Sequence, residues 1–262
     1  MLGLGTSVTS IDSGQIYKEL SELSNYDDLD IHFDFSTLTG VHGSEVTAAT
    51  NLGESGAGNN ISTNSGTPVL DRENFGGRSS VAFTSGGDYL NMNRTIESAG
   101  KSFTLFVVLQ RDDTNELVLV GSDVVDGLTN YIKFTGSGTE IETVMGAEES
   151  AVTTTLDSTT NGTVSYTQVA GVPSVLVMRR DADGAFYVYA DNGLFIAGLA
   201  GAMKAAAGFR FAQIGGNVAH HPSTTYDGNI GEVGFYDADI GPVAAITLSK
   251  ELSTKWGVNR RS

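Results

Sequence analysis

Short runs of alternating apolar and polar residues recur along the chain and predict β-strands. In residues 29–35 every odd-numbered position is apolar and every even-numbered position is Asp or His, so the two kinds of side chain lie on opposite faces of one strand. Similar runs separated by turn residues predict further strands at 79–83, 89–92, 117–120, 131–134, 141–145, 175–179, 185–189, 209–214 and 230–236. This pattern is typical of an antiparallel all-β domain.

Two segments depart from alternation in an informative way. Residues 103–109 are apolar almost throughout, which predicts a central strand buried on both faces. Near the C-terminus, Pro242 takes a favoured first position of a helix, and Gly257 ends that helix. Its apolar face repeats at helical spacing and comprises Ala245, Leu248, Leu252 and Trp256. We expect Trp256 to hold this helix against the sheet.

Three regions lack a clear period. Residues 36–74 are polar and rich in Gly, Asn and Thr, which predicts a long surface excursion with at most one short strand. Loops of this length are usually functional or ordered by partners. Residues 146–162 predict a second polar loop, and residues 194–208 fit a strand that runs into a short helical turn.

Residues 1–24 are interpreted as an N-terminal arm, separate from a sandwich domain at 25–262. Ile16, Leu20 and Leu23 lie on one face of a short helix. The segment is too short to fold alone, so it docks either on its own sandwich or on a neighbouring molecule. The sequence leaves both placements open.

Composition narrows the functional classes. The formal net charge of −16 repels duplexes and membrane surfaces, so we expect no nucleic-acid partner. The apolar runs are far shorter than the ~18 residues of a spanning helix, so we expect no membrane insertion. The chain has no cysteine, which excludes disulfides, thiolate zinc sites and thiol nucleophiles.

Four segments carry short motifs in a shared order. They are F-G-G-R-S-S-V-A-F at 75–83 with D-Y-L at 88–90, K-S-F-T-L-F at 101–106, the hairpin at 174–190, and G-N-I-G-E-V-G-F-Y at 228–236. In this order they resemble laminin-G-like domains of the concanavalin A-like lectin/glucanase superfamily. The resemblance covers roughly residues 28–257 and implies a two-sheet antiparallel jelly roll, a β-sandwich. Gly231 and Gly234 depart from the family's final strand, which often reads G-x-I-D-E-V-R-I-Y.

Catalytic motifs are missing. Glucanases of that superfamily carry Glu-x-Asp-x-x-Glu on one strand, a spacing that suits a retaining mechanism. No Glu here has Asp two residues later. The nearest pairs are Glu140 with Glu142 and Glu148 with Glu149. Glu140 and Glu142 would share a strand face, and a solvated face explains them more simply than a two-carboxylate site. Nucleophile-elbow and phosphate-loop motifs are also absent from the sequence. We therefore assign no catalytic residue and expect a protein that is not an enzyme.

Candidate metal ligands are few. They are Asp and His residues close together in the sequence: Asp30, His32 and Asp34; Asp123 and Asp126; Asp181 and Asp183; His220 and His221. Carboxylates in a turn suit Ca²⁺. A wet outer strand face explains the first group better than a metal does, and a loop explains His220 and His221 better. A hairpin turn explains Asp181 and Asp183 as well as Ca²⁺ does, so we assign no metal and no cofactor.

The start M-L-G-L-G-T-S-V-T-S, the acidic Gly-rich composition and the lack of cysteine resemble small structural proteins of tailed bacteriophages. This second resemblance implies a non-enzymatic virion protein that decorates the capsid or belongs to the tail. Its expected partners are other virion proteins and further copies of itself, with a host-surface glycan as an additional ligand. The alternative is a carbohydrate-binding module of a surface or secreted protein. Surface aromatic residues that could stack on sugar rings are Tyr89, Tyr131, Tyr187 and Trp256, although Trp256 is better explained by its place on the helix.

Overall fold

The structure is a computed structural model that describes residues 29–84, 86–98, 102–112, 117–122, 130–135, 140–144, 152–155, 169–199, 208–216 and 225–258. The arm predicted at 1–24 lies outside these residues. Within the described part, no helix is long and apolar enough to cross a membrane.

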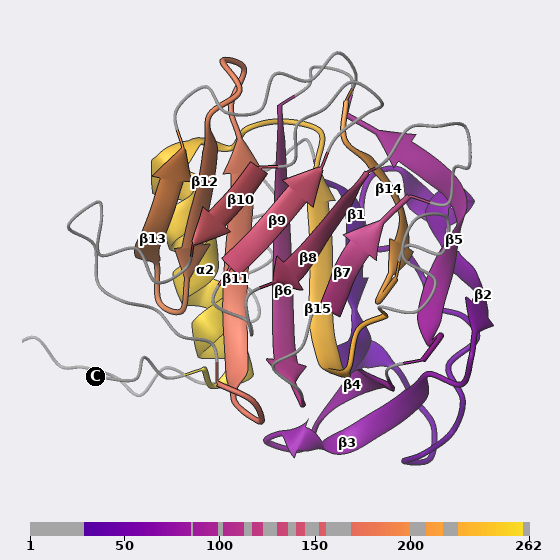
Figure 1. Ribbon diagram of the computed structural model, residues 1–262. Helices are drawn as coiled ribbons and strands as arrows, with labels where there is room; N and C mark the ends of the chain where they lie inside the picture. The colour runs from indigo at the N-terminus through magenta and orange to yellow at the C-terminus, as the bar shows by residue number, and fades with distance from the viewer. Residues whose placement is uncertain are drawn as a thin grey trace, which may run out of the picture.

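Eight strands of the described chain form an antiparallel sheet, called sheet A (Figure 1). Their spatial order is β13 (Leu194–Leu199), β12 (Phe186–Ala190), β11 (Pro173–Arg180), β6 (Phe103–Arg111), β15 (Gly228–Tyr236), β4 (Arg78–Phe83) and β3 (Val69–Phe75), with β1 (Leu29–Asp34) beside β15. Along one edge of β15 runs β6; along the other, β4 pairs with its first half and β1 with its second half.

Seven further described strands form sheet B, which faces sheet A. Their order is β10 (Val152–Thr155), β9 (Glu140–Val144), β8 (Tyr131–Thr135), β7 (Leu117–Gly121), β14 (Arg210–Ile214), β5 (Tyr89–Glu97) and β2 (Ile61–Ser65). Two short 3-10 helices lie in the segment that joins β1 to β2: η2 (Phe35–Thr37) directly follows β1, and η3 (Gly56–Asn59) comes just before β2. The architecture is the predicted two-sheet antiparallel jelly-roll sandwich with a C-terminal helix.

The helix α2 (Gly241–Trp256) adds a third layer on the outer face of sheet A, opposite sheet B (Figure 1). The predicted apolar stripe of α2 packs on outward side chains of β6 and β11, including Phe106, Val108 and Val177. The inward side chains of the same strands, such as Leu105 and Val107, fill the core between the sheets. This explains why β6 is buried along its whole length, as the sequence predicted.

Both ends of α2 follow the sequence prediction. Pro242 lies in the first turn, and the Gly241 N–H donates to the Asp239 carboxylate. At the other end Gly257 has a positive φ of 66°, and its N–H donates to two carbonyls of the last turn. Between the ends, Ser249 and Ser253 accept hydrogen bonds from the N–H groups of the β12–β13 turn, at 3.1 and 2.8 Å.

The two glycines that depart from the family pattern lie beneath aromatic rings. A Cβ on Gly231 would come within 2.7 Å of the Trp256 ring, and one on Gly234 would overlap the ring of Phe106. Neither glycine has a positive φ. Space for the rings, and not backbone conformation, therefore requires glycine at these positions.

Two predictions about loops need correction. The excursion at 36–74 holds two strands, β2 and β3, where at most one was expected. The predicted loop at 146–162 contains β10. The strand expected at the start of 194–208 is β13, and the helical turn expected after it falls on residues 200–207, outside the described residues. The polar side chains of β2 and β10 hide the strand pattern, because these strands lie at the two edges of sheet B.

The excursion closes one side of the sandwich. Residues 43–46 pair with the edge of β3, where the Gly43 N–H donates to the Leu70 carbonyl at 2.8 Å. A few residues later, Ala49 exchanges hydrogen bonds with Ile61 of β2 in the other sheet. The segment between them therefore crosses from sheet A to sheet B.

Candidate functional site

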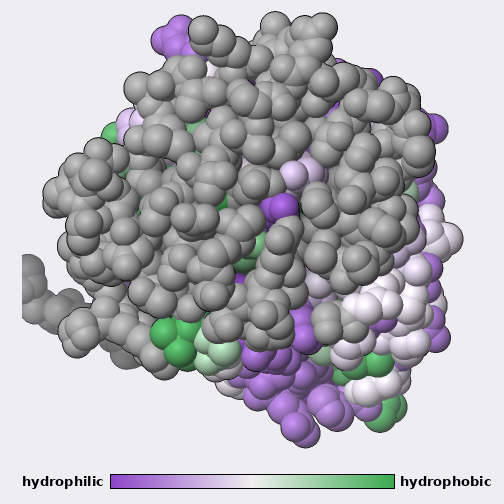
Figure 2. All heavy atoms as spheres, viewed as in Figure 1, coloured by the Kyte–Doolittle hydropathy of each residue, from purple (hydrophilic) through white to green (hydrophobic). Residues whose placement is uncertain are grey.

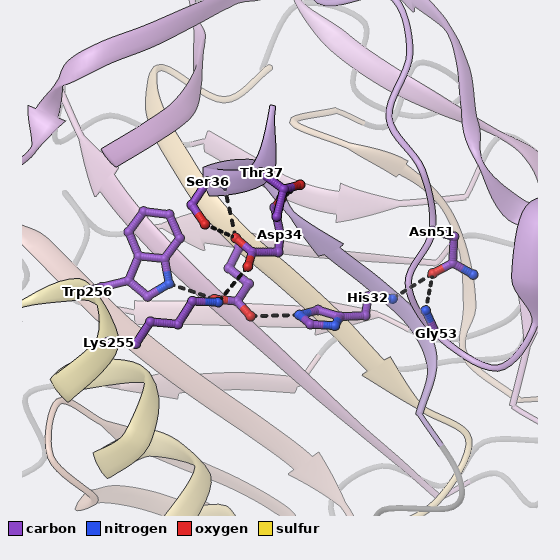
Figure 3. Close-up of polar contacts among 9 residues, drawn as sticks. His32, Asp34, Ser36, Thr37, Asn51, Gly53, Lys255 and Trp256 are labelled. Atoms are coloured by element: carbon purple, nitrogen blue, oxygen red, sulfur yellow. Dashed lines mark hydrogen bonds and ion pairs between the residues drawn. The ribbon is translucent and has the colours of Figure 1, made fainter. Parts of the chain in front are cut away.

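The densest group of ionisable side chains in the described chain lies where β1, β15 and α2 meet (Figure 3). Glu232 is at its centre, and His32 Nε2 donates to Glu232 Oε1 at 2.7 Å. The other carboxylate oxygen accepts from Lys255 Nζ at 2.7 Å and from Trp256 Nε1 at 2.6 Å. Lys255 Nζ also donates to Asp34 Oδ2 at 2.8 Å. We call these five side chains the β1–α2 clamp.

Strand register brings the clamp together. The alternation in β1 directs His32 and Asp34 to the outer face of sheet A, and Asp34 pairs with Glu232 across the β1–β15 ladder. A register shift between Ile230 and Glu232 turns the latter outward, toward the last turn of α2. That turn supplies Lys255 and Trp256.

Burial and charge set the protonation of the clamp. The exposed side-chain fractions are 3% for Glu232 and 9% for Lys255. Burial raises the pKa of Glu232, but the hydrogen bond from His32 and the charge of Lys255 outweigh it, and the pKa falls to about 2. Burial lowers the pKa of Lys255, yet the charges of Glu232 and Asp34 turn the net change upward.

These two pKa shifts are opposite to those expected in an acid–base catalytic site. A general acid or base works best with a pKa near the operating pH. Here the carboxyl group and the amine are both moved away from neutrality, so neither exchanges a proton readily at pH 7. The clamp acts as a fixed set of ion pairs that fastens α2 and β1 to β15.

Asn51 supports the clamp from the edge of β1 that faces away from β15 (Figure 3). Its Oδ1 accepts from the N–H groups of His32 at 2.8 Å and Gly53 at 3.0 Å. Its amide group donates to the Asp30 carbonyl and to Ser55. One side chain thereby ties the segment that follows it to the backbone of β1.

A second ion pair holds the start of α2. Arg179 Nη1 donates to both carboxylate oxygens of Asp239, at 2.8 and 2.7 Å. The same guanidinium group lies 4.0 Å from the centre of the Tyr187 ring. The ring predicted to stack on sugars is therefore engaged by Arg179 on one face.

The other aromatic candidates are also covered. Tyr131 is buried and Tyr89 is half-buried. Among the described residues the exposed large apolar side chains are aliphatic: Val41, Leu52, Val169 and Val243. Trp256 is buried against Phe75, with ring centres 5.1 Å apart, which confirms its predicted role in attaching the helix.

The predicted metal candidates do not assemble a site in the described part of the chain, where no three His, Asp or Glu side chains are placed to hold an ion. The face of β1 that carries His32 and Asp34 was expected to be wet, whereas both side chains are engaged in the clamp. Asp181 accepts backbone N–H groups from Asp183 and Ala185 and so shapes its hairpin turn.

Several candidates cannot be placed. Glu140 and Glu142 lie on β9, and the structure describes the backbone but not the side chains at these two positions. Four other predicted sets lie outside the described residues: Asp123 and Asp126, Glu148 and Glu149, His220 and His221, and the arm at 1–24.

An open hollow of about 150 Å³ lies on the excursion between β3 and β2. Its apolar lining is Leu38, Val46, Ala48 and Leu70, and its polar lining is Thr39, Ser44, Glu45 and Thr47. Val46 and Leu70 are buried, whereas all four polar residues are exposed. Buried apolar groups thus form the floor, and hydroxyl groups and a carboxylate form the rim.

Strand contacts fix the shape of this hollow. The Val46 N–H donates to the Pro68 carbonyl at 2.8 Å, and Asn64 Nδ2 on β2 donates to Glu45 Oε1 at 2.8 Å. Figure 2 shows a hydrophilic surface over β3 and β4 at the lower edge of the molecule, beside paler and apolar side chains toward β2.

The sequence pattern did not reveal the partners of His32 and Asp34. Glu232 is 200 residues away from His32 in the chain, so no local periodicity connects them. One signal was available: an acidic residue within a long buried strand needs a cation, and Lys255 stands at the end of the helix predicted to cover that strand.

No family model matches this chain, and no curated protein matches its sequence. Solved structures with a similar fold include domain 4 of AbnA, an arabinanase from Geobacillus stearothermophilus, in complex with arabinotriose. Its TM-score is 0.56 at 13% sequence identity, and the match covers 85% of this chain and 98% of that domain. The binding domain of Paraclostridial mosquitocidal protein 1 has a TM-score of 0.57 at 10% identity, over 86% of this chain and 52% of that one. The binding domain of botulinum neurotoxin DC in complex with SialylT has a TM-score of 0.54 at 12% identity, over 87% of this chain and 52% of that one.

The chain spans about half the length of the two toxin domains and nearly all of domain 4 of AbnA. At these identities the likeness shows the fold alone. It agrees with the two-sheet antiparallel jelly roll that the motifs predicted.

Proposed function

We propose that the protein is a non-enzymatic recognition domain that binds a carbohydrate at the hollow between β2 and β3, and that it is carried on a virion. One observation carries this proposal: the densest described cluster of ionisable groups is consumed in holding α2, whereas the hollow offers hydroxyl groups above an apolar floor. Such an arrangement suits binding without bond cleavage.

The chemistry of the hollow fits a sugar ring. A pyranose presents hydroxyl groups around its edge and C–H groups on its face, which complement the polar rim and the apolar floor. The volume of about 150 Å³ is below the roughly 300–1,000 Å³ of pockets that enclose drug-sized ligands. The expected ligand is therefore a single terminal sugar residue, with the rest of the glycan outside the hollow.

The comparisons support the class of function by analogy of fold. One similar structure is named for its complex with arabinotriose and another for its complex with SialylT. This chain covers nearly all of domain 4 of AbnA and about half of the toxin domain. Where a ligand binds this chain, and which ligand it is, are argued from the hollow of this chain and not from those structures.

A glycan array with three proteins tests this proposal. The wild type is expected to bind at least one glycan, and Ala48→Trp, which fills the hollow, is expected to abolish that binding. Thr63→Trp places the same bulk on an exposed position of β2 outside the hollow lining and should bind as the wild type does. Wild-type failure on the array, or unchanged binding by Ala48→Trp with unaltered thermal unfolding, contradicts the assignment.

The virion location rests on the composition and on the resemblance of the N-terminal sequence to phage structural proteins. The expected partners are capsid or tail proteins and further copies of this chain. Mass spectrometry of purified particles should detect the protein at a fixed copy number. Its absence from particles, together with glycan binding by the free protein, would favour a carbohydrate-binding module of a surface or secreted protein.

A further inference from the structure

The rim of the hollow between β2 and β3 carries a negative charge. Glu45 is exposed and lines the hollow together with the hydroxyl groups of Thr39, Ser44 and Thr47. None of the described residues that line the hollow is Lys, Arg or His. A ligand in the hollow therefore meets a carboxylate and hydroxyl groups on the rim, and no positively charged side chain.

The carboxylate of Glu45 is held from both β2 and β3. Asn64 Nδ2 on β2 donates to Glu45 Oε1 at 2.8 Å and to the Val46 carbonyl at 3.2 Å. The backbone of Glu45 forms an isolated antiparallel bridge with Val69, the first residue of β3. The side chain of Glu45 is thus partly ordered before a ligand arrives, which lowers the entropic cost of binding.

The carboxylate keeps room for a ligand, but only for a donor. A carboxylate has no donor group and about four acceptor positions on its two oxygens. Among the described residues, Asn64 donates to this carboxylate and occupies one position on Oε1. The positions on Oε2 suit the O–H groups of a sugar and do not suit a second carboxylate.

The charges near the hollow also disfavour an acidic ligand. Nδ1 and Nε2 of His42 lie 3.9 and 4.0 Å from carboxylate oxygens of Asp71 and Glu73. Arg72 Nη2 donates to the Leu38 carbonyl at 3.5 Å. Both basic side chains are therefore placed beside acceptors of the protein, and the formal net charge of −16 repels anionic ligands as they approach.

We propose that the hollow binds an uncharged terminal sugar and that Glu45 determines this specificity. The inference rests on the proposed carbohydrate site and adds the class of its ligand. Neighbouring hydroxyl groups of the sugar donate to Glu45, while the C–H face of the ring lies on the floor formed by Val46 and Leu70. A uronic acid or a sialic acid brings a second carboxylate to this rim, where the two like charges repel each other.

Matched pairs of glycans test this specificity. Each pair ends either in glucose, galactose or mannose or in the corresponding uronic acid, so its members differ by one carboxylate. In binding titrations the wild type should prefer the neutral member of the pair it binds by about tenfold or more.

Glu45→Gln nearly keeps the side-chain shape and removes the charge. It should weaken binding of the neutral member about fivefold, because a hydrogen bond to a charged acceptor is stronger than one to a neutral acceptor, and it should narrow the preference. Glu54→Gln removes the same charge at an exposed position outside the hollow lining and should leave both values unchanged. Thermal unfolding of both variants should match that of the wild type, because both side chains are exposed.

The outcomes separate this inference from the proposed function. If the wild type prefers the acidic members and Ala48→Trp abolishes that binding, the carbohydrate site stands and its specificity for uncharged sugars is overturned. If the preference for neutral members is the same in Glu45→Gln as in the wild type, the role of Glu45 is overturned. A wild type that binds no glycan refutes both the site and its specificity.

Discussion

Glu232→Gln tests whether the β1–α2 clamp is structural. Gln has nearly the shape of Glu, but it carries no negative charge, and its NH₂ group cannot accept a hydrogen bond. Lys255 then stays buried with Asp34 as its remaining carboxylate in the clamp. Removal of one partner of a buried ion pair costs about 3–5 kcal/mol. We expect a loss of this size in the free energy of unfolding at pH 7.

The pH dependence of the free energy of unfolding gives an independent measure of how much ionised Glu232 stabilises the fold. The pKa of Glu232 is about 2 in the folded protein, against an ordinary value of 4.5. Because the folded value is the lower one, the ionised carboxylate stabilises the fold above pH 4.5, and this contribution is lost as the pH falls toward 2. The difference corresponds to about 3 kcal/mol, at about 1.4 kcal/mol per pKa unit. The wild type should lose this contribution on acidification, and the Gln variant should not.

Urea unfolding at pH 7, 4.5 and 3 measures both effects. Trp256 is the single tryptophan of the chain and donates to Glu232, so its fluorescence reports directly on the clamp. Glu54→Gln is the control, because Glu54 is exposed and its variant should stay within about 0.5 kcal/mol of the wild type. A Glu232→Gln protein within about 1 kcal/mol of the wild type at pH 7, with the same loss on acidification, refutes the reasoning.

Two further substitutions probe the surroundings of the clamp. Gly234→Ala should lower the free energy of unfolding by about 1–3 kcal/mol, because the new methyl group overlaps the Phe106 ring; a neutral result in urea unfolding would show that the ring moves freely. Asn51→Ala should cost about 2–3 kcal/mol, because the N–H groups of His32 and Gly53 lose their acceptor. Asn93→Ala, at an exposed position, is its control in the same assay and should be neutral.

The fold could be predicted because its signals are local. Alternation in 29–35 and the continuous apolar run at 103–109 follow from burial on one face or on two, and both were placed correctly. Strands β2 and β10 escaped prediction because they lie at the edges of sheet B. An edge strand buries less of its surface, so its sequence carries less of the pattern on which prediction depends.

Only part of the clamp could be predicted from the sequence. Alternation placed His32 and Asp34 together on one strand face, but their exposure depends on what covers that face. The cover is the last turn of α2, which returns more than 200 residues later. Pairing at such separation leaves no period in the sequence, so the face was expected to be wet.

The glycines of the last strand held the missing information. Where the final strand of laminin-G-like domains often has Asp and Arg, this chain has Gly231 and Gly234, at positions where no positive φ requires glycine. Outward glycines in a strand otherwise built to be buried indicate that something lies close above it, and here that is the rings of Trp256 and Phe106. Once the face is covered, any acid left on it must be paired, and Glu232 is paired by Lys255 from the same turn that brings Trp256. The two glycines thus explain why the cluster of charges beneath the helix is covered and paired, so that it fastens α2 to the sheet.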